Sequence, residues 1–155
     1  MTTTDIHQFL ELNSFPKSYA ACHLKACTKN NCLHRIFGTL LPQSVTFGKA
    51  ILPSALEEAN RMDGQCRHYS PAVTHRCYAG FDHLFDDVKK KDLIPLRQAI
   101  YDYMNGRSNF YRYSNAEEGY LLTQEKADRI ADIFGRFGYS APTYAHTFMA
   151  YKFRL

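Results

Sequence analysis

The chain has 155 residues, of which 45% are hydrophobic, and this length and composition favour one globular domain and exclude an intrinsically disordered chain. Its net charge of +4 is spread along the sequence, whereas a protein held on DNA by phosphate contacts usually concentrates its Lys and Arg residues. The start lacks the features of a signal peptide and no window reaches the ~18 apolar residues of a membrane span, so we expect a cytoplasmic protein without a membrane partner.

The first half of the chain predicts short helices separated by turn residues. Apolar residues at helical spacing favour three helices, and the run between the second and the third favours an extended segment. Pro and Gly residues, which break helices, mark the ends of these segments. In chain order the expected elements are a helix over 4–12, a helix over 32–41, an extended segment over 44–51 and a helix over 55–62.

The second half predicts longer helices and one hairpin. Two short aromatic and apolar runs separated by five residues are typical of a β-hairpin. Thr123 is a good N-cap for the clearest helix, and Gly138 is a good C-cap. In chain order the expected elements are an amphipathic segment over 73–88, a helix over 93–104, strands over 109–113 and 119–122, a helix over 124–137 and a last segment with helical spacing over 142–151.

Together these elements predict an α+β fold, mainly helical, as a single domain over residues 1–155 with a small β-hairpin or sheet. Within this domain we distinguish an N-terminal Cys-rich part, residues 1–78, which we expect to bind a metal. The C-terminal part, residues 90–155, is predicted as helix–hairpin–helix.

Three cysteines, Cys22, Cys27 and Cys32, recur at intervals of five among Lys, Asn and His residues. Disulfides are rare in the cytoplasm and the chain has an odd number of cysteines, so metal ligation is favoured over disulfides and over inert core thiols. Positions five apart on a helix are rotated by roughly 140°, so the chain around these thiols must turn for them to converge. Zinc, which takes four thiolate or imidazole ligands, is the expected metal.

The spacing alone leaves the fourth ligand open. Cys66 and Cys77 are the candidates, and His68 and His75 lie between them as alternates. Four thiolates would fill the zinc shell and make the site structural, and the same cysteines would hold an iron–sulfur cluster as the alternative cofactor. Cys77 next to Arg76 would instead be the activated thiol of a thiol-dependent enzyme, because nearby positive charge lowers a thiol pKa.

Four short motifs occur together over nearly the full chain. They are Cys22-x4-Cys27-x4-Cys32-Leu33, Gly64-Gln65-Cys66, Tyr111-Arg112-Tyr113 and Leu122-Thr123. Their combination resembles a small bacterial family known as a domain of unknown function, in which an arginine follows the Cys-Leu pair directly, whereas His34 intervenes before Arg35 here. The resemblance implies the first three cysteines and Cys66 as the four ligands, and it leaves Cys77 outside the set. It implies no activity.

A possible binding surface comprises Arg97, Arg107, Tyr111, Arg112 and Tyr113. A helix followed by a hairpin is the order of elements in winged-helix DNA binders. In such a fold Arg97 and Arg107 would face the DNA groove and Arg112 would lie on the wing. Acidic residues in the wing loop would repel phosphate. We therefore favour packing or a protein contact for the tyrosines over nucleic-acid binding.

These observations predict a small cytoplasmic zinc-binding accessory or regulatory protein that contacts another protein, with no catalytic residue assigned. A winged-helix-like regulator bound to nucleic acid is one alternative. An iron–sulfur protein or thiol-dependent enzyme is the other.

Overall fold

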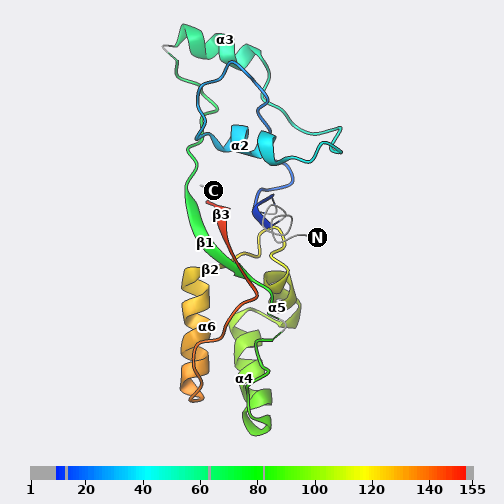
Figure 1. The fold of residues 1–155 in the computed structure, drawn as a ribbon, viewed down its shortest axis with the longest axis vertical. Helices are drawn as coiled ribbons and strands as arrows, with labels where there is room; N and C mark the ends of the chain where they lie inside the picture. The colour runs from blue at the N-terminus through cyan, green and yellow to red at the C-terminus, as the bar shows by residue number, and fades with distance from the viewer. Residues whose placement is uncertain (1–9, 13, 63, 82, 153–155) are drawn as a thin grey trace. The chain divides into compact units, whose positions relative to one another are not determined.

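The computed structural model describes residues 10–12, 14–62, 64–81 and 83–152 of the chain. They form helices and a small three-stranded sheet, an α+β architecture as the sequence predicts (Figure 1). The chain divides into two compact units, Met1–Thr74 with Tyr151–Leu155 and His75–Ala150. We call them the Cys-rich unit and the helical unit. Within the described residues, no helix is long and apolar enough to cross a membrane.

The described part of the Cys-rich unit contains the helical residues 10–12, two further short helices and the loops between them. Its apolar centre includes Phe15 and Leu33, with Phe15 stacked on Phe37 at 4.8 Å between ring centroids. Two isolated bridges tie the loops together, Ala21 with Ala50 in parallel and Cys32 with Pro71 in antiparallel orientation. The helices are α2 (Leu33–Leu40) and α3 (Ser54–Arg61).

Both helices of this unit match the sequence predictions. Helix α2 ends at Leu40, and its C-cap Leu41 is extended because Pro42 follows and disfavours the helical conformation of the residue before it. No strand forms over 44–51, where only Ala50 joins a bridge. Of the helix predicted over 4–12, residues 10–12 are helical, and the rest lies outside the described residues.

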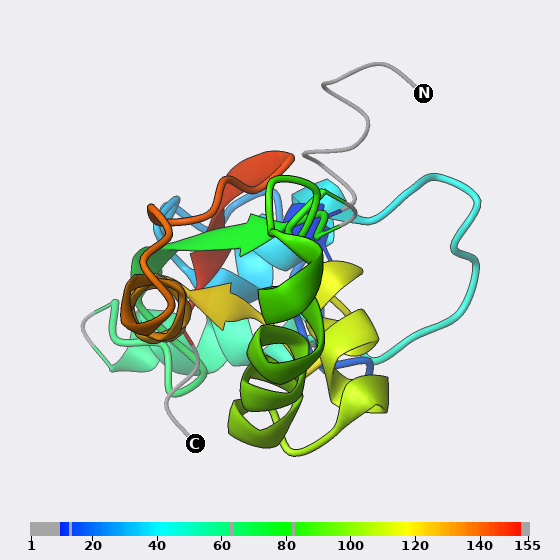
Figure 2. The same cartoon turned by 90° about the horizontal axis from the view of Figure 1, so that it is seen from below.

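The helical unit combines an antiparallel sheet of order β2-β1-β3 with three helices. In the register of β1 and β2, Cys77 pairs with Thr123 and Tyr78 with Leu122. Helix α4 packs against both α5 and α6, and Figure 2 shows the three helices on one side of β1. The elements are β1 (Thr74–Ala79), α4 (Lys90–Tyr103), α5 (Arg107–Ser114), β2 (Leu122–Thr123), α6 (Gln124–Arg136) and β3 (His146–Tyr151).

The core of this unit lies among the helices and the sheet. Leu96 and Ile100 of α4, Leu122 of β2 and Ile130 of α6 are fully buried there. Leu96 and Ile100 lie four residues apart on α4, which is the helical spacing seen in the sequence. The helices predicted over 93–104 and 124–137 are therefore confirmed as α4 and α6.

The predicted β-hairpin is wrong, because residues 107–114 form helix α5. Phe110 and Ser114 are both buried, and this spacing of four places them on one helical face rather than on a strand. Asn105 and Gly106 have φ angles of 58° and 116°, so they make the turn that separates α4 from α5. Of the second predicted strand only Leu122, as part of β2, is extended in the sheet.

The amphipathic segment predicted over 73–88 contains strand β1, and the segment with helical spacing over 142–151 contains strand β3 instead of a helix. In β1 the buried residues are Cys77 and Ala79, and in β3 they are Phe148 and Ala150. This alternation of period two is the pattern of a strand with one face on the core. In the last segment the helical spacing of Tyr144, Phe148 and Tyr151 hides this strand pattern in the sequence.

Candidate functional site

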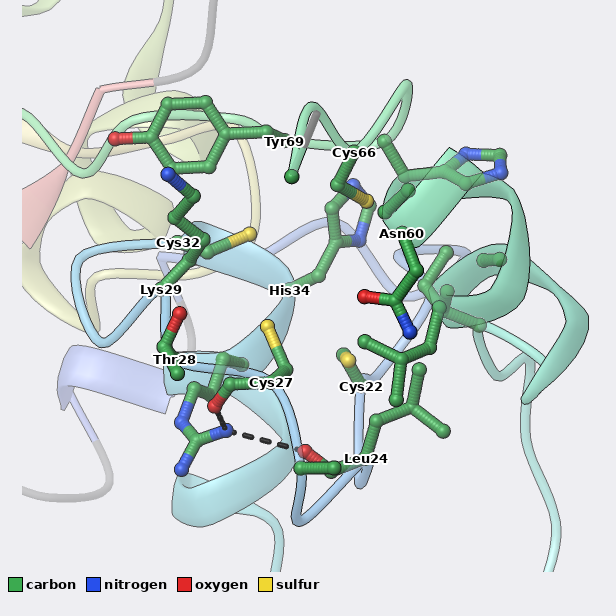
Figure 3. Close-up of a pocket in the computed structure, with 18 residues that line it drawn as sticks. Cys22, Leu24, Cys27, Thr28, Lys29, Cys32, His34, Asn60, Cys66 and Tyr69 are labelled. Atoms are coloured by element: carbon green, nitrogen blue, oxygen red, sulfur yellow. Dashed lines mark hydrogen bonds between the residues drawn. The ribbon is translucent and has the colours of Figure 1, made fainter. Parts of the chain in front are cut away.

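Cys22, Cys27, Cys32 and Cys66, the four cysteines implied by the family resemblance, line one pocket of the Cys-rich unit. The cavity has a volume of about 150 Å³, and Figure 3 shows the four sulfur atoms around it. Cys32 is buried and the other three are partly exposed. Residues more than thirty positions apart in the sequence thus contribute to one thiol-lined cavity.

The backbone of Cys22 lies against helix α2. Its N–H donates to the carbonyl oxygen of His34 at 2.8 Å. On the preceding residue, the Ala21 N–H donates to the carbonyl of Lys49 at 2.9 Å, and the Ala21 carbonyl accepts from Ile51 at 2.8 Å. These bonds hold Cys22 between α2 and the segment before α3.

Cys27 is held by a turn that helix α2 stabilises. The Cys27 N–H donates to the carbonyl of Leu24 at 3.1 Å. From α2, the Arg35 guanidinium donates to the carbonyls of Leu24 at 3.1 Å and of Cys27 at 2.6 Å (Figure 3). Charge-assisted bonds of this kind are stronger than neutral ones, so Arg35 is a positioning residue for the Cys27 turn.

Cys32 is the N-cap residue of α2, and its neighbours on both sides pair with residues 70–72. The Leu33 N–H donates to the carbonyl of Ser70, and the Ala72 N–H donates to the carbonyl of Asn31, both at 2.8 Å. This pairing draws the chain that follows Cys66 to the start of α2.

Cys66 follows the turn that ends helix α3. Gly64, with a φ of 78°, donates its N–H to the carbonyl of Ala59 at 2.8 Å, a common C-terminal motif. The carbonyl of Cys66 then accepts from Tyr69 at 2.9 Å in the next turn. The glycine before Cys66 therefore reverses the chain so that the thiol returns to the pocket.

His34 also lines the pocket, and sequence analysis did not include it among the ligands. Its Nδ1 lies 2.7 Å from the carbonyl oxygen of Ala20. A carbonyl only accepts, so Nδ1 is the donor, and Nε2 is the nitrogen left to bind a metal. The ring stacks on Tyr19 with centroids 4.5 Å apart. A hydrogen-bonded imidazole with a free second nitrogen is a usual metal ligand, and its position two residues after Cys32 was the available signal.

The other alternates are distributed differently. Among the described residues, His68 lines the pocket, whereas Cys77 and His75 do not. Cys77 lies on β1 in the helical unit, fully buried, and burial raises its pKa to about 11. A reactive thiol needs exposure and a lowered pKa, so these properties do not fit the activated thiol of an enzyme.

The four thiols share a pocket without forming a finished metal centre. Within the described ranges, no group of three or more His, Cys, Asp or Glu side chains is arranged to hold a metal ion. In a zinc centre each thiolate lies about 2.3 Å from the metal. Metal binding would therefore require the four thiols to come closer together, and it stays a prediction.

The predicted binding surface is divided in the helical unit. Arg97, Arg107 and Tyr111 line one pocket between α4 and α5. Arg112 lies elsewhere on α5, where it donates to the Tyr120 hydroxyl at 2.8 Å. Tyr113 packs against the core. Because residues 107–114 are helical, the wing required by the winged-helix hypothesis is missing from this part of the described chain.

Comparison with known proteins identifies the family. A family model described as "Family of unknown function (DUF6078)" matches residues 1–154. The chain belongs to this family. Membership in DUF6078 confirms the resemblance to a domain of unknown function that the cysteine motifs carry, and it brings no activity. Neither the curated proteins nor the solved structures contain a match to the chain.

Proposed function

We propose that this DUF6078 protein is a structural zinc-binding module that acts as an accessory or regulatory protein by contacting another protein. The observation that carries the zinc proposal is the shared pocket of Cys22, Cys27, Cys32 and Cys66, which excludes the fifth cysteine. Zinc prefers thiolates, and four of them complete its tetrahedral shell. The proposal places the protein in a reducing compartment such as the cytoplasm, where thiols stay available as ligands.

The geometry supports a structural metal over a catalytic one. A catalytic zinc keeps one position open for water or substrate, commonly with His or carboxylate ligands. Here the side chains around the cavity include four thiols, and Figure 3 shows His34 beside them. In this arrangement zinc would cross-link the α2 segment to the turn after α3. The free energy of zinc binding would therefore add directly to the stability of the fold.

Contact with another protein is supported by the segment between α2 and α3. Phe47 is 95% exposed, and Val45 and Leu52 in the same segment are also exposed. A single exposed apolar residue is ordinary, but an almost fully solvated phenylalanine close to two others is typical of an interaction site. A photocrosslinker at position 47 should give a discrete crosslinked partner in cells, whereas the same group at exposed Ser108 should not.

The zinc proposal is tested by the metal content of anaerobically purified protein. We expect about one zinc per chain, because the four thiols make one tetrahedral site. The protein should be colourless, because zinc has a filled d shell. Serine at position 22, 27, 32 or 66 should each lower zinc content and thermal stability, and Cys77→Ala should leave zinc content unchanged. Bound iron with a broad visible absorption would assign the same thiols to an iron–sulfur cluster. Fully folded, metal-free protein that takes up no zinc would contradict the proposal.

A further inference from the structure

A second pocket lies in the helical unit between α4, α5 and the segment that follows β1. Its volume is about 340 Å³. Aromatic rings and two guanidinium groups form most of its wall. The lining residues are Phe81, Phe85, Arg97, Tyr101, Arg107, Phe110, Tyr111 and Ser114. We call it the arginine pocket.

The two arginines are held against aromatic rings rather than against carboxylates. The Arg97 guanidinium carbon lies 4.9 Å from the centroid of Phe85, and that of Arg107 lies 5.6 Å from the centroid of Tyr111. Among the described residues, no carboxylate forms an ion pair with either arginine. A guanidinium that stacks by its face presents N–H groups at its edge, where they can bind an oxyanion in a bidentate manner. Arg107 also hydrogen-bonds to Tyr111.

Arg112 on the same helix shows the contrast. Its side chain donates to the Tyr120 hydroxyl and lies 3.8 Å from the Glu117 carboxylate. The charge of Arg112 is thus matched within the fold. The charges of Arg97 and Arg107 in the pocket are not matched by an ion pair with any described acidic side chain, so both would attract an anion bound there.

The pocket is rigidly built. The Asn109 side chain donates to the carbonyls of Met104 at 3.1 Å and Asn105 at 3.2 Å, which fixes the turn from α4 into α5. At its base, Phe110 is buried and contacts Tyr101 edge-on at 5.3 Å. The Ser114 hydroxyl oxygen accepts from the backbone N–H of Phe81 at 2.8 Å. These contacts hold the aromatic wall of the pocket and the backbone from which the two arginine side chains extend.

Two tyrosines, Tyr101 and Tyr111, line the pocket beside the arginines. Burial raises the pKa of Tyr101, and a hydrogen bond to Tyr111 adds to this shift. A hydrogen bond to the Arg107 guanidinium and the charge of that group lower the pKa of Tyr111. Flat rings beside the charges offer stacking surface for a ligand ring.

We propose that the arginine pocket binds a small aromatic oxyanion, a flat ring that carries a phosphate or carboxylate group. The oxyanion contacts Arg97 and Arg107, and the ring stacks among the aromatic side chains of the pocket. This site involves only residues of the helical unit and does not depend on the zinc proposal.

The test is calorimetric titration of the full chain with phenyl phosphate and benzoate. Inorganic phosphate and cyclohexanecarboxylate serve as comparison probes that lack the flat ring. We expect both aromatic probes to bind, and to bind more tightly than their non-aromatic counterparts. Arg97→Gln and Arg107→Gln should each weaken binding about tenfold or more, since each removes charge-assisted hydrogen bonds.

Arg112→Gln is the matched control, because it removes an equal charge from the same helix and should leave affinity within about twofold. All three arginines are at the surface, so the variants should keep the melting temperature of the parent. Absence of binding at millimolar probe concentration, or equal losses in all three variants, would overturn the proposal. Tighter binding of a short oligothymidylate that depends on Arg97 and Arg107 would instead assign the pocket to single-stranded nucleic acid.

Discussion

Gly38 of helix α2 lies directly against the backbone of Cys22. A Cβ atom at position 38 would stand 2.7 Å from the carbonyl oxygen of Cys22, closer than real Cβ contacts, so only glycine fits. The partner is backbone and cannot rotate away. This contact, with the bond from Cys22 to His34 one turn earlier, fixes where the first thiol of the pocket lies.

Gly38→Ala should displace Cys22 from α2. We expect a loss of about 1–3 kcal/mol in the free energy of unfolding, the usual effect of overpacking, together with weaker zinc binding. Chemical denaturation and competition with a metal chelator measure the two effects. The control is Gly135→Ala, since nothing lies within 4 Å of a Cβ at that helical position. It should stabilise the protein slightly. Equal effects of both substitutions would contradict this role for Gly38.

The substitution His34→Asn tests whether His34 is a zinc ligand or only supports the loop beside the pocket. The asparagine amide can replace the Nδ1 donor to Ala20, but it has no counterpart of Nε2. If four thiolates hold the zinc, the variant should retain about one zinc per chain. Cobalt substitution adds a direct measurement, because the sulfur-to-cobalt charge-transfer intensity reports the number of thiolates. Loss of the metal as complete as in Cys32→Ser would make His34 a ligand.

The buried thiol of Cys77 predicts a loss of stability at high pH. Its pKa is raised from 9.0 to about 11 in the folded chain, so the folded state retains the proton that the unfolded state loses. The unfolded chain binds fewer protons in this window, and the free energy of unfolding therefore falls as pH rises from about 9 to about 11. The contribution is on the order of 2 kcal/mol. If this thiol is responsible, the free energy of unfolding should fall more steeply with pH in the parent than in Cys77→Ala over the range from about 9 to about 11. Equal pH dependence of the two proteins would contradict the prediction.

Tyr144→Phe should stabilise the helical unit. The Tyr144 hydroxyl is buried and has no hydrogen-bond partner in the described part of the chain, whereas its ring packs on Tyr78 at 5.0 Å. Removing the hydroxyl keeps the ring contacts and relieves an unsatisfied polar group, which is worth about 1 kcal/mol. Thermal denaturation measures the gain.

Tyr139→Phe is the matched control for Tyr144→Phe. The Tyr139 hydroxyl donates to Asp92 at 2.8 Å and accepts from the Lys89 N–H at 3.1 Å. Its removal should lower the melting temperature. A loss of stability in both variants would show that Tyr144 has a partner after all.

The sequence by itself determined the features whose signals are local. Helices α2 and α6 carry apolar residues at a spacing of three and four and end at recognisable residues, so their bounds were predicted closely. The three regularly spaced cysteines were visible for the same reason. The family resemblance added Cys66, and the structure places it in the same pocket as the other three.

Only the tertiary structure decided the features that depend on distant partners. Strand β1 pairs with β2 across more than forty residues, and no local pattern specifies that partner. The run 109–113 carries aromatic residues that suit a strand, yet burial of Phe110 and Ser114 against the core selects a helix. The grouping of Arg97 with Arg107, and the separation of both from Arg112, follows from that helix. Local periodicity fixes elements, but long-range packing fixes which side chains meet.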